Sequence, residues 1–360
     1  MKKILALVLA LCMVFALCAC GQTANTTTEA APAEEVVVVE EVEEVVVEEV
    51  AEAEYKLGMG VSVSTDSTTD GNAQVDATVA AVVTDAEGVI VAVRLDCAQN
   101  KMDVTAGTCD PAATFLSKME KGDDYNMKTY GGSVGEWYEE AMGFEAYCVG
   151  KTAEEIQNME LEVNAEGYNV STDPELLATC TISIDAFIDA VVKACGDAWA
   201  VSFTTADEFT LGVACATSAD ESTDPDADND GVVKMYTEFG AAVVGADGVV
   251  LAALNDAIQP QISFNAEGVI GDIKFSGTKR ELGANYNMVT YGNAIAEWDA
   301  QSAAFSAYCV GKTAAEISGL ETEVNEEGNQ VTTDADLFAQ CTMSIGGMMA
   351  VIAQAANYAR

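Results

Sequence analysis

The alternation of apolar and polar residues predicts the same series of strands and helices twice along the chain. Residues 57–64, 75–84 and 89–96 alternate around a D-A-E-G turn, which predicts antiparallel strands. A helical pattern follows around Trp137, and an alanine-rich apolar run after position 184 predicts a final helix. Strands followed by segregated helices predict the α+β class, here as two tandem copies of a small antiparallel sheet with helices.

The duplication is directly visible in the letters. YGGSVGEWYEEAMGFEAYCVGKTAEEI (130–156) matches YGNAIAEWDAQSAAFSAYCVGKTAAEI (291–317), and 117–183 aligns with 278–344 without a gap. Upstream, TVAAVVTDAEGVIVAV from position 78 matches EFGAAVVGADGVVLAA from position 238. We therefore expect module one at 55–198 and module two at 209–357, joined by a connector around WAVSFTTADE.

The first 19 residues have the organisation of an export signal. Lys2 and Lys3 precede an apolar run that is too short to span a membrane comfortably. The run ends in LCACG, which resembles a bacterial lipobox and implies that Cys20 is lipidated and becomes the first mature residue. An ordinary cleaved signal is the alternative. Either interpretation predicts an extracytoplasmic protein, and the lipobox predicts a membrane anchor.

Residues 20–54 are acidic and low in complexity, without lysine or arginine. A valine stripe suits one helix face, but β-branched residues and like-charged glutamates four apart weaken such a helix. We interpret the segment as a spacer between the anchor and the folded modules. A partner-binding coiled coil is the alternative, although no opposite charges would fix its register.

Charge and composition exclude several functions. The 360 residues carry 59 acidic and 16 basic side chains, a formal net charge of −43, which repels nucleic acid. There is no histidine, so histidine-ligated metal centres and Ser-His or Cys-His nucleophiles are excluded. With half of its residues hydrophobic, the chain can still build substantial cores.

A Cys-Thr-x-Ser-Ile kernel opens the predicted final helix of each module. Residues 178–184 read ATCTISI and residues 339–345 read AQCTMSI. Each resembles the attachment motif of the FMN-binding domain family, Ser-Gly-Ala-Thr-x-Thr-Ser before an alanine-rich helix. That family includes flavin subunits of the sodium-pumping quinone reductase and tandem-domain lipoproteins of extracellular electron transfer. The resemblance implies FMN esterified to Ser183 and Ser344, beside Thr181, Thr342, Cys180 and Cys341.

Elementary chemistry both supports and opposes flavin attachment at the kernels. A helix N-terminus suits a phosphate. However, Thr179 and Gln340 replace the glycine that lets the family's backbone approach the flavin, and Asp185 would repel a phosphate in module one. Gly346 stands at the corresponding place in module two. The alternative is that both serines are only helix N-caps.

Eight cysteines lie beyond the signal and the lipobox. Cys148 and Cys180 recur as Cys309 and Cys341 at the same separation, which suits one disulfide in each module of an exported protein. They suit buried small hydrophobes equally well. Cys97 and Cys109 could form a further pair. No C-x-x-C occurs, so the sequence gives little support to a redox dithiol or an iron–sulfur site.

Two further patterns carry candidate chemistry. Asp226, Asp228 and Asp230 before Gly231 match the first half of a calcium loop, but position twelve is Thr237 where glutamate is expected, so an acidic hairpin loop is favoured. Paired aromatic residues could stack on a flavin, although core packing is the default for residues beside apolar helix faces. These pairs are Tyr125/Tyr286, Tyr130/Tyr291 and Trp137/Trp298.

Two functions follow as expectations. The first is a lipid-anchored electron carrier that holds FMN and exchanges electrons with redox partner proteins, without being a stand-alone catalyst. The second is a surface binding or structural lipoprotein that keeps the fold without flavin.

Overall fold

The computed structural model describes residues 52–292 and 294–360. The expected signal peptide, the lipobox at Cys20 and nearly all of the expected spacer lie outside these residues. The described part belongs to one compact unit, which spans Val50–Arg360. Its class is α+β with antiparallel sheets, as predicted.

The strands of module one form an antiparallel sheet in the order β3-β2-β1-β6. Its strands are β1 (Ala53–Ser64), β2 (Asn72–Asp85), β3 (Ile90–Asp103) and β6 (Val201–Thr205). The first three are the predicted strands, extended at their ends. The connector contributes β6, which pairs with β1 from Ala53↔Thr205 to Leu57↔Val201.

The strands of module two form two sheets, one made of long strands and one made of short strands. The order β10-β9-β7 joins β7 (Phe209–Ser218), β9 (Tyr236–Gly245) and β10 (Val250–Ile258). The order β12-β11-β8 joins β8 (Gly231–Lys234), β11 (Gln261–Phe264) and β12 (Ile270–Lys274). Their apolar faces meet the sheet of module one in a single shared core that includes Leu57, Val79, Leu211, Phe239 and Phe264. The two repeats therefore bury their sheets against each other.

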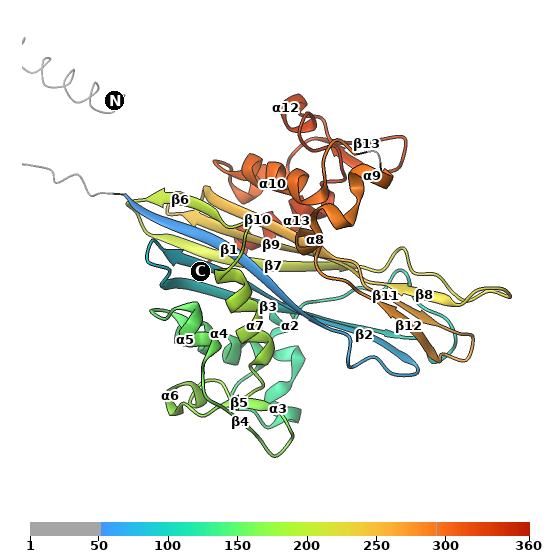
Figure 1. Ribbon diagram of the computed structural model, residues 1–360, viewed down its shortest axis with the longest axis horizontal. Coiled ribbons are helices and arrows are strands. Elements are labelled where there is room, and N and C mark those ends of the chain that lie inside the picture. Colours follow the sequence, from blue (N-terminus) through green and yellow to red (C-terminus); the bar gives the residue numbers. More distant parts are fainter. Residues whose placement is uncertain (1–51, 293) are drawn as a thin grey trace, which may run out of the picture. The chain divides into compact units, whose positions relative to one another are not determined.

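The helices cover the two outer faces of the stacked sheets (Figure 1). In module one, α4 (Trp137–Cys148) packs on β3 and α7 (Asp185–Cys195) on β1 and β2. In module two, α10 (Trp298–Cys309) packs on β10 and α13 (Gly346–Tyr358) on β7 and β9. Each module also has a separate hydrophobic core between its helices and its sheet. This core includes Phe144 and Ile184 in module one, and Phe305 and Ile345 in module two.

The final helices lie directly on the sheet backbone. A Cβ on Gly58 would sit 2.0 Å from the carbonyl oxygen of Ala194, and one on Gly212 would sit 1.8 Å from that of Ala355. Only glycine permits such an approach. This explains the small residues in LGMGVSV (57–63) and in the equivalent stretch LGVACAT (211–217). The close approach also determines the position of each kernel, which directly precedes the final helix.

Short elements surround each kernel. In module one they are α2 (Lys118–Lys121), η1 (Gly122–Tyr125), α3 (Met127–Gly131), α5 (Ala153–Gln157), β4 (Leu161–Val163), β5 (Asn169–Ser171) and α6 (Pro174–Leu177). In module two they are α8 (Lys279–Leu282), η2 (Gly283–Tyr286), α9 (Met288–Gly292), α11 (Ala314–Ser318), β13 (Thr322–Val324), β14 (Gln330–Thr332) and α12 (Ala335–Phe338). Of the described helices, none is long and apolar enough to cross a membrane.

Candidate functional site

The kernel of module one is bound by a buried carboxylate of the chain itself. Glu140 of α4 is 0 % exposed, and its Oε2 accepts the amides of Thr181 and Ile182 at 2.7 and 3.1 Å. Its Oε1 accepts the amide of Gly135 at 3.0 Å. The Thr181 hydroxyl lies 3.2 Å from Oε2. The amides that could cradle a phosphate are therefore already satisfied by an internal anion.

The start of helix α7 is likewise occupied. The N-cap residue is Ile184, which makes no side-chain cap, and Ser183 stands one residue before it. The Ser183 hydroxyl donates to Asp185 Oδ2 at 3.3 Å, and the side-chain amide of Asn169 donates to the same carboxylate. Interpreting Ser183 as the N-cap was therefore wrong, and Asp185 keeps a negative charge where a phosphate would bind.

The kernel of module two has the same backbone but different chemistry. Gln301 replaces Glu140, and its Oε1 accepts the Thr342 amide at 2.9 Å while its Nε2 donates to the Ala296 carbonyl. The N-cap of α13 is Ile345, so the N-cap interpretation was wrong for Ser344 as well. Ser344 is exposed, and its hydroxyl makes no hydrogen bond within 52–292 and 294–360. This serine is chemically available.

The kernel cysteines are packing residues. All eight cysteines of the described chain are free, so the disulfides Cys148–Cys180 and Cys309–Cys341 are not formed. Neither is a Cys97–Cys109 pair. Burial raises the pKa of Cys180 to about 12 and that of Cys341 to about 11. Such thiols stay protonated and behave as small hydrophobes.

A cleft of about 1110 Å³ opens beside the kernel of module two. Thr342, Met343 and Ser344 line it on one side. The facing walls come from β7, β9, α8, η2, the start of α10 and the β13–β14 hairpin. They include Tyr236, Glu238, Lys279, Tyr286 and Trp298. The cleft thus brings together Ser344, the expected attachment residue, with Tyr286 and Trp298, which are two of the six paired aromatic residues.

Lys279 lies among three aromatic rings of this cleft. Its Nζ is 4.4 Å from the ring centroid of Tyr236, 4.8 Å from that of Tyr286 and 5.3 Å from that of Trp298. It also donates to the Tyr236 hydroxyl at 3.1 Å. Burial lowers the pKa of Lys279 to about 8, although nearby carboxylates oppose that shift. The cluster is a cation–π site filled by the protein's own ammonium group.

Glu238 supplies a buried carboxylate without a full set of partners. The residue is 7 % exposed, and its Oε2 finds no hydrogen-bond partner in the described chain. Burial raises the pKa of Glu238 to about 7, while the Tyr236 hydroxyl and Lys279 pull it back. A Cβ on Gly347 would sit 2.2 Å from Oε2, so the carboxylate lies against the first turn of α13. Module one has Thr78 and Ala186 at these two places.

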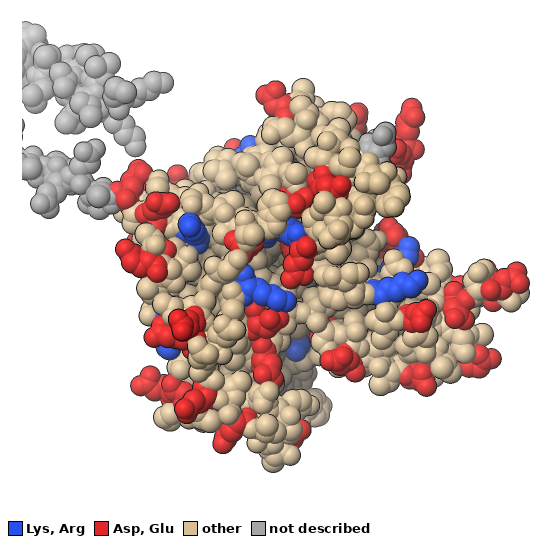
Figure 2. Space-filling view, viewed as in Figure 1, with Lys and Arg blue, Asp and Glu red and all other residues tan. Residues whose placement is uncertain are grey.

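Acidic residues dominate the cleft walls. Lys279 is the single basic residue among those that line it, against six carboxylates: Asp220, Glu221, Glu238, Glu323, Glu326 and Glu327. Figure 2 shows the same imbalance on one face of the molecule, where acidic side chains far outnumber Lys and Arg. This field favours cationic or neutral ligands over free anions.

The tryptophans and two of the tyrosines among the paired aromatic candidates differ in exposure. Trp137 and Trp298 are buried in the module cores, as the default interpretation predicted. Core packing was wrong for Tyr130 and Tyr291, which are 87 % and 86 % exposed.

The acidic loop before β8 forms a self-satisfied turn. Asp226 Oδ1 accepts the amides of Asp228 and Asn229 at 2.8 and 2.9 Å, and Asn229 Nδ2 also donates to it. In the part of the chain that the structure describes, no three acidic or cysteine side chains converge as a metal site. Asp226, Asp228 and Asp230 are not brought together around a cation.

Sequence reasoning missed the residues that distinguish the two kernels. Glu140, Gln301, Glu238 and Lys279 were not singled out. A comparison of equivalent positions in the two modules could have found them, because Glu140 aligns with Gln301 and Thr78 with Glu238.

Comparisons with known proteins give no relative: no protein family, no curated protein and no solved structure matches this chain.

Proposed function

We propose that the chain is an extracytoplasmic, lipid-anchored binding protein whose module two holds a planar ligand of the flavin type at Ser344. In the specific form of the proposal, a flavin transferase moves the FMN group of FAD to the Ser344 hydroxyl with release of AMP, and the protein passes electrons between redox partners. The observation that carries it is the exposed, unbonded hydroxyl of Ser344 on a cleft of about 1110 Å³ with aromatic walls. Clefts for organic ligands commonly have volumes of roughly 300–1,000 Å³.

The donor set of module two suits covalent attachment better than free binding. The Thr342 amide is taken by Gln301, and six carboxylates face the cleft. A free phosphate monoester carries close to two negative charges at neutral pH. Esterification leaves a single negative charge on the phosphate. Because the bond is covalent, the cleft does not need a strong affinity for the phosphate group. Bound FMN would supply the electron-carrying chemistry, and the chain would orient it and shield it from water.

Module one does not fit the same group. Glu140 fills the kernel amides, and Asp185 holds the start of α7. We therefore expect module one to serve as the scaffold on which the sheet of module two is buried.

The test is coexpression of the full chain with an extracytoplasmic flavin transferase, followed by intact mass and in-gel flavin fluorescence. We expect one FMN per chain, lost in Ser344→Ala and kept in the matched control Ser183→Ala. An unmodified mass, with no flavin retained noncovalently, would overturn the flavin proposal.

The acidic cleft favours a second candidate, a noncovalent binder of organic cations. Glu238 offers an unpaired buried oxygen beside aromatic rings, and this combination recognises ammonium and aromatic amine groups. Titration with an aromatic amine, followed by calorimetry at low and at physiological salt, would test it. We expect Glu238→Gln to weaken binding about tenfold or more. Equal affinity of wild type and variant would refute the cation site.

A further inference from the structure

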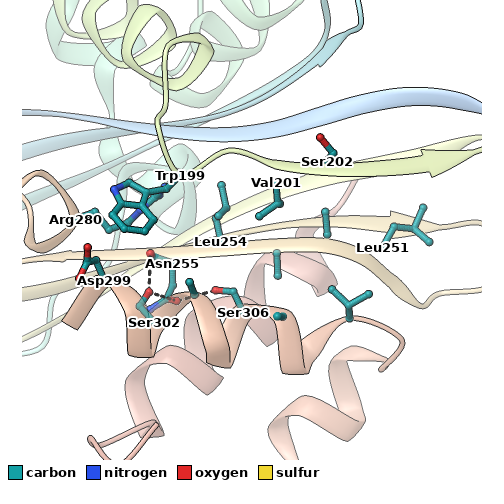
Figure 3. Close-up of a pocket in the computed structure, with 15 residues that line it drawn as sticks. Trp199, Val201, Ser202, Leu251, Leu254, Asn255, Arg280, Asp299, Ser302 and Ser306 are labelled. Atoms are coloured by element: carbon teal, nitrogen blue, oxygen red, sulfur yellow. Dashed lines mark hydrogen bonds between the residues drawn. The ribbon is translucent and has the colours of Figure 1, made fainter. Parts of the chain in front are cut away.

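A second, smaller cavity lies between the sheets on the other side of module two. It has a volume of about 230 Å³. One wall is formed by the segment around Trp199 together with β6. The other wall is formed by β10 together with the residues of α10 between Asp299 and Ala307 (Figure 3). Apolar groups from Val201, Leu251 and Leu254 line most of it. Polar groups gather at one end, where Figure 3 shows Arg280, Asp299 and Asn255 near Trp199.

Asn255 lines this cavity and carries an unsatisfied donor. The residue is 1 % exposed, and its Oδ1 accepts the hydroxyls of Ser302 and Ser306 at 2.8 and 2.9 Å. Its Nδ2 has no hydrogen-bond partner in 52–292 and 294–360. A buried donor without a partner is destabilising, and a ligand acceptor would relieve that cost. The two serine hydroxyls fix the orientation of the amide, with its oxygen turned toward them.

At the same end of the cavity, Asp299 supplies a hydrogen-bond acceptor and Arg280 supplies a cation. Asp299 Oδ1 is buried and, among the described residues, also lacks a partner. Arg280 is 6 % exposed and pairs with Asp197 through Nη2 alone, at 2.8 Å to both carboxylate oxygens. The rest of its guanidinium is not used by that pair. One end of an apolar cavity thus offers amide and guanidinium donors next to a carboxylate acceptor.

Module one shows what the same place looks like when the chain fills it. The residues equivalent to Asn255, Ser306 and Trp199 are Leu95, Glu145 and Arg360. Glu145 accepts the Leu95 amide at 2.8 Å and forms ion pairs with Arg360 at 3.0 Å and Arg94 at 3.4 Å. At this place in module one, Glu145 is thus paired within the chain, although Arg94 Nε lacks a partner among the described residues.

We propose that this cavity binds a small zwitterion with a short apolar side chain, a free α-amino acid of the valine or leucine class. Its carboxylate would accept from Asn255 Nδ2 and the guanidinium of Arg280, and its ammonium would donate to Asp299. The apolar side chain would contact Leu254 and Val201. The size is suitable, because a cavity of roughly 150 Å³ holds a benzene molecule.

Calorimetric titration of the full chain with L-leucine and L-valine tests the proposal. We expect saturable binding that Asn255→Leu weakens at least about tenfold, because leucine is the residue of module one at this place. Asp299→Asn should weaken L-leucine more than 4-methylpentanoate, which has the carboxylate and side chain without the amine. Ala303→Met alters an exposed lining residue to its module-one counterpart Met142 and should narrow the cavity without affecting the core.

The outcomes separate clearly. The proposal is overturned if neither amino acid gives saturable heat at millimolar concentration. It is also overturned if Asn255→Leu and Ala303→Met both leave the affinity unchanged. If Asn255→Leu fails to fold, Ala303→Met and Asp299→Asn decide alone. Ser183→Ala lies outside this cavity and outside the cleft at Ser344, and it serves as the matched control. Its affinity for L-leucine should equal that of wild type, whatever becomes of the flavin proposal.

Discussion

The two kernels have nearly the same backbone environment and different electrostatics. In module one, Glu140 places a full negative charge under the amides of Thr181 and Ile182. In module two, Gln301 places a neutral carbonyl under Thr342, and the buried charge moves to Glu238 on the neighbouring strand. The first carboxylate is satisfied by the chain and the second is not. A duplicated fold can thus keep one copy as scaffold and leave the other open to a ligand by exchanging a few polar residues.

The largest expected effect concerns Glu140. Glu140→Ala leaves the amides of Thr181, Ile182 and Gly135 without their acceptor, and we expect a loss of about 4 kcal/mol in the free energy of unfolding. Urea denaturation of the full chain at neutral pH measures it. The matched variant Gln301→Ala removes one amide acceptor and should cost about 1–2 kcal/mol. Equal losses in the two variants would show that the charge at Glu140 makes no difference to the kernel.

A second effect is the pH dependence contributed by Glu238. Burial raises its pKa from an ordinary 4.5 to about 7. Between these values the folded chain holds a proton that the unfolded chain has released, so stability falls as pH rises. Above pH 7 the loss is complete. We expect Glu238→Gln to gain about 3 kcal/mol in the free energy of unfolding, relative to wild type, between pH 4.5 and pH 8.

Denaturation at several pH values measures this difference. Asp96 and Asp256 have pKa values raised to about 6 by burial, one in each module, and they contribute equally to wild type and variant. They therefore cancel in the comparison. A stability difference that does not change with pH would mean that Glu238 is ionised normally in the folded chain.

Much of this architecture follows from the pattern of the chain. The alternation in 57–64 and 75–84 predicts β1 and β2, and the alanine-rich run predicts α7, because these periods depend only on local burial. The stacking of the two sheets could not be predicted in the same way. A strand buried on both faces, such as β2, shows that a second layer exists but does not say which segment supplies it.

The candidate site was predictable only in part. The kernel sequence located Ser344, and the structure places it on the cleft. Glu238 was missed because one glutamate at the start of an apolar strand looks like an exposed end residue. Its burial depends on α13, which arrives from more than a hundred residues away in sequence.

Gly347 gives a smaller and more local test of the difference between modules. Gly347→Ala introduces the side chain that module one carries at Ala186, and the new Cβ would collide with Glu238 Oε2. We expect a loss of about 1–2 kcal/mol in the free energy of unfolding. Combining it with Glu238→Thr, which copies Thr78, should recover most of that loss. A double-mutant cycle by urea denaturation measures the coupling, and additive effects would contradict the contact.

The smallest expected effect distinguishes a reactive serine from a capping serine. Ser183 and Ser344 both precede the N-cap, so Ser183→Ala and Ser344→Ala should each change the free energy of unfolding by less than about 0.5 kcal/mol. Thr152 and Thr313 are true caps that accept the amides of Glu155 and Glu316, and their alanine variants should each cost about 1 kcal/mol. These two threonines calibrate the same denaturation experiment within each module. A loss at Ser344 as large as at Thr313 would mean that its hydroxyl stabilises the helix, and the chemical reason to expect a ligand there would disappear.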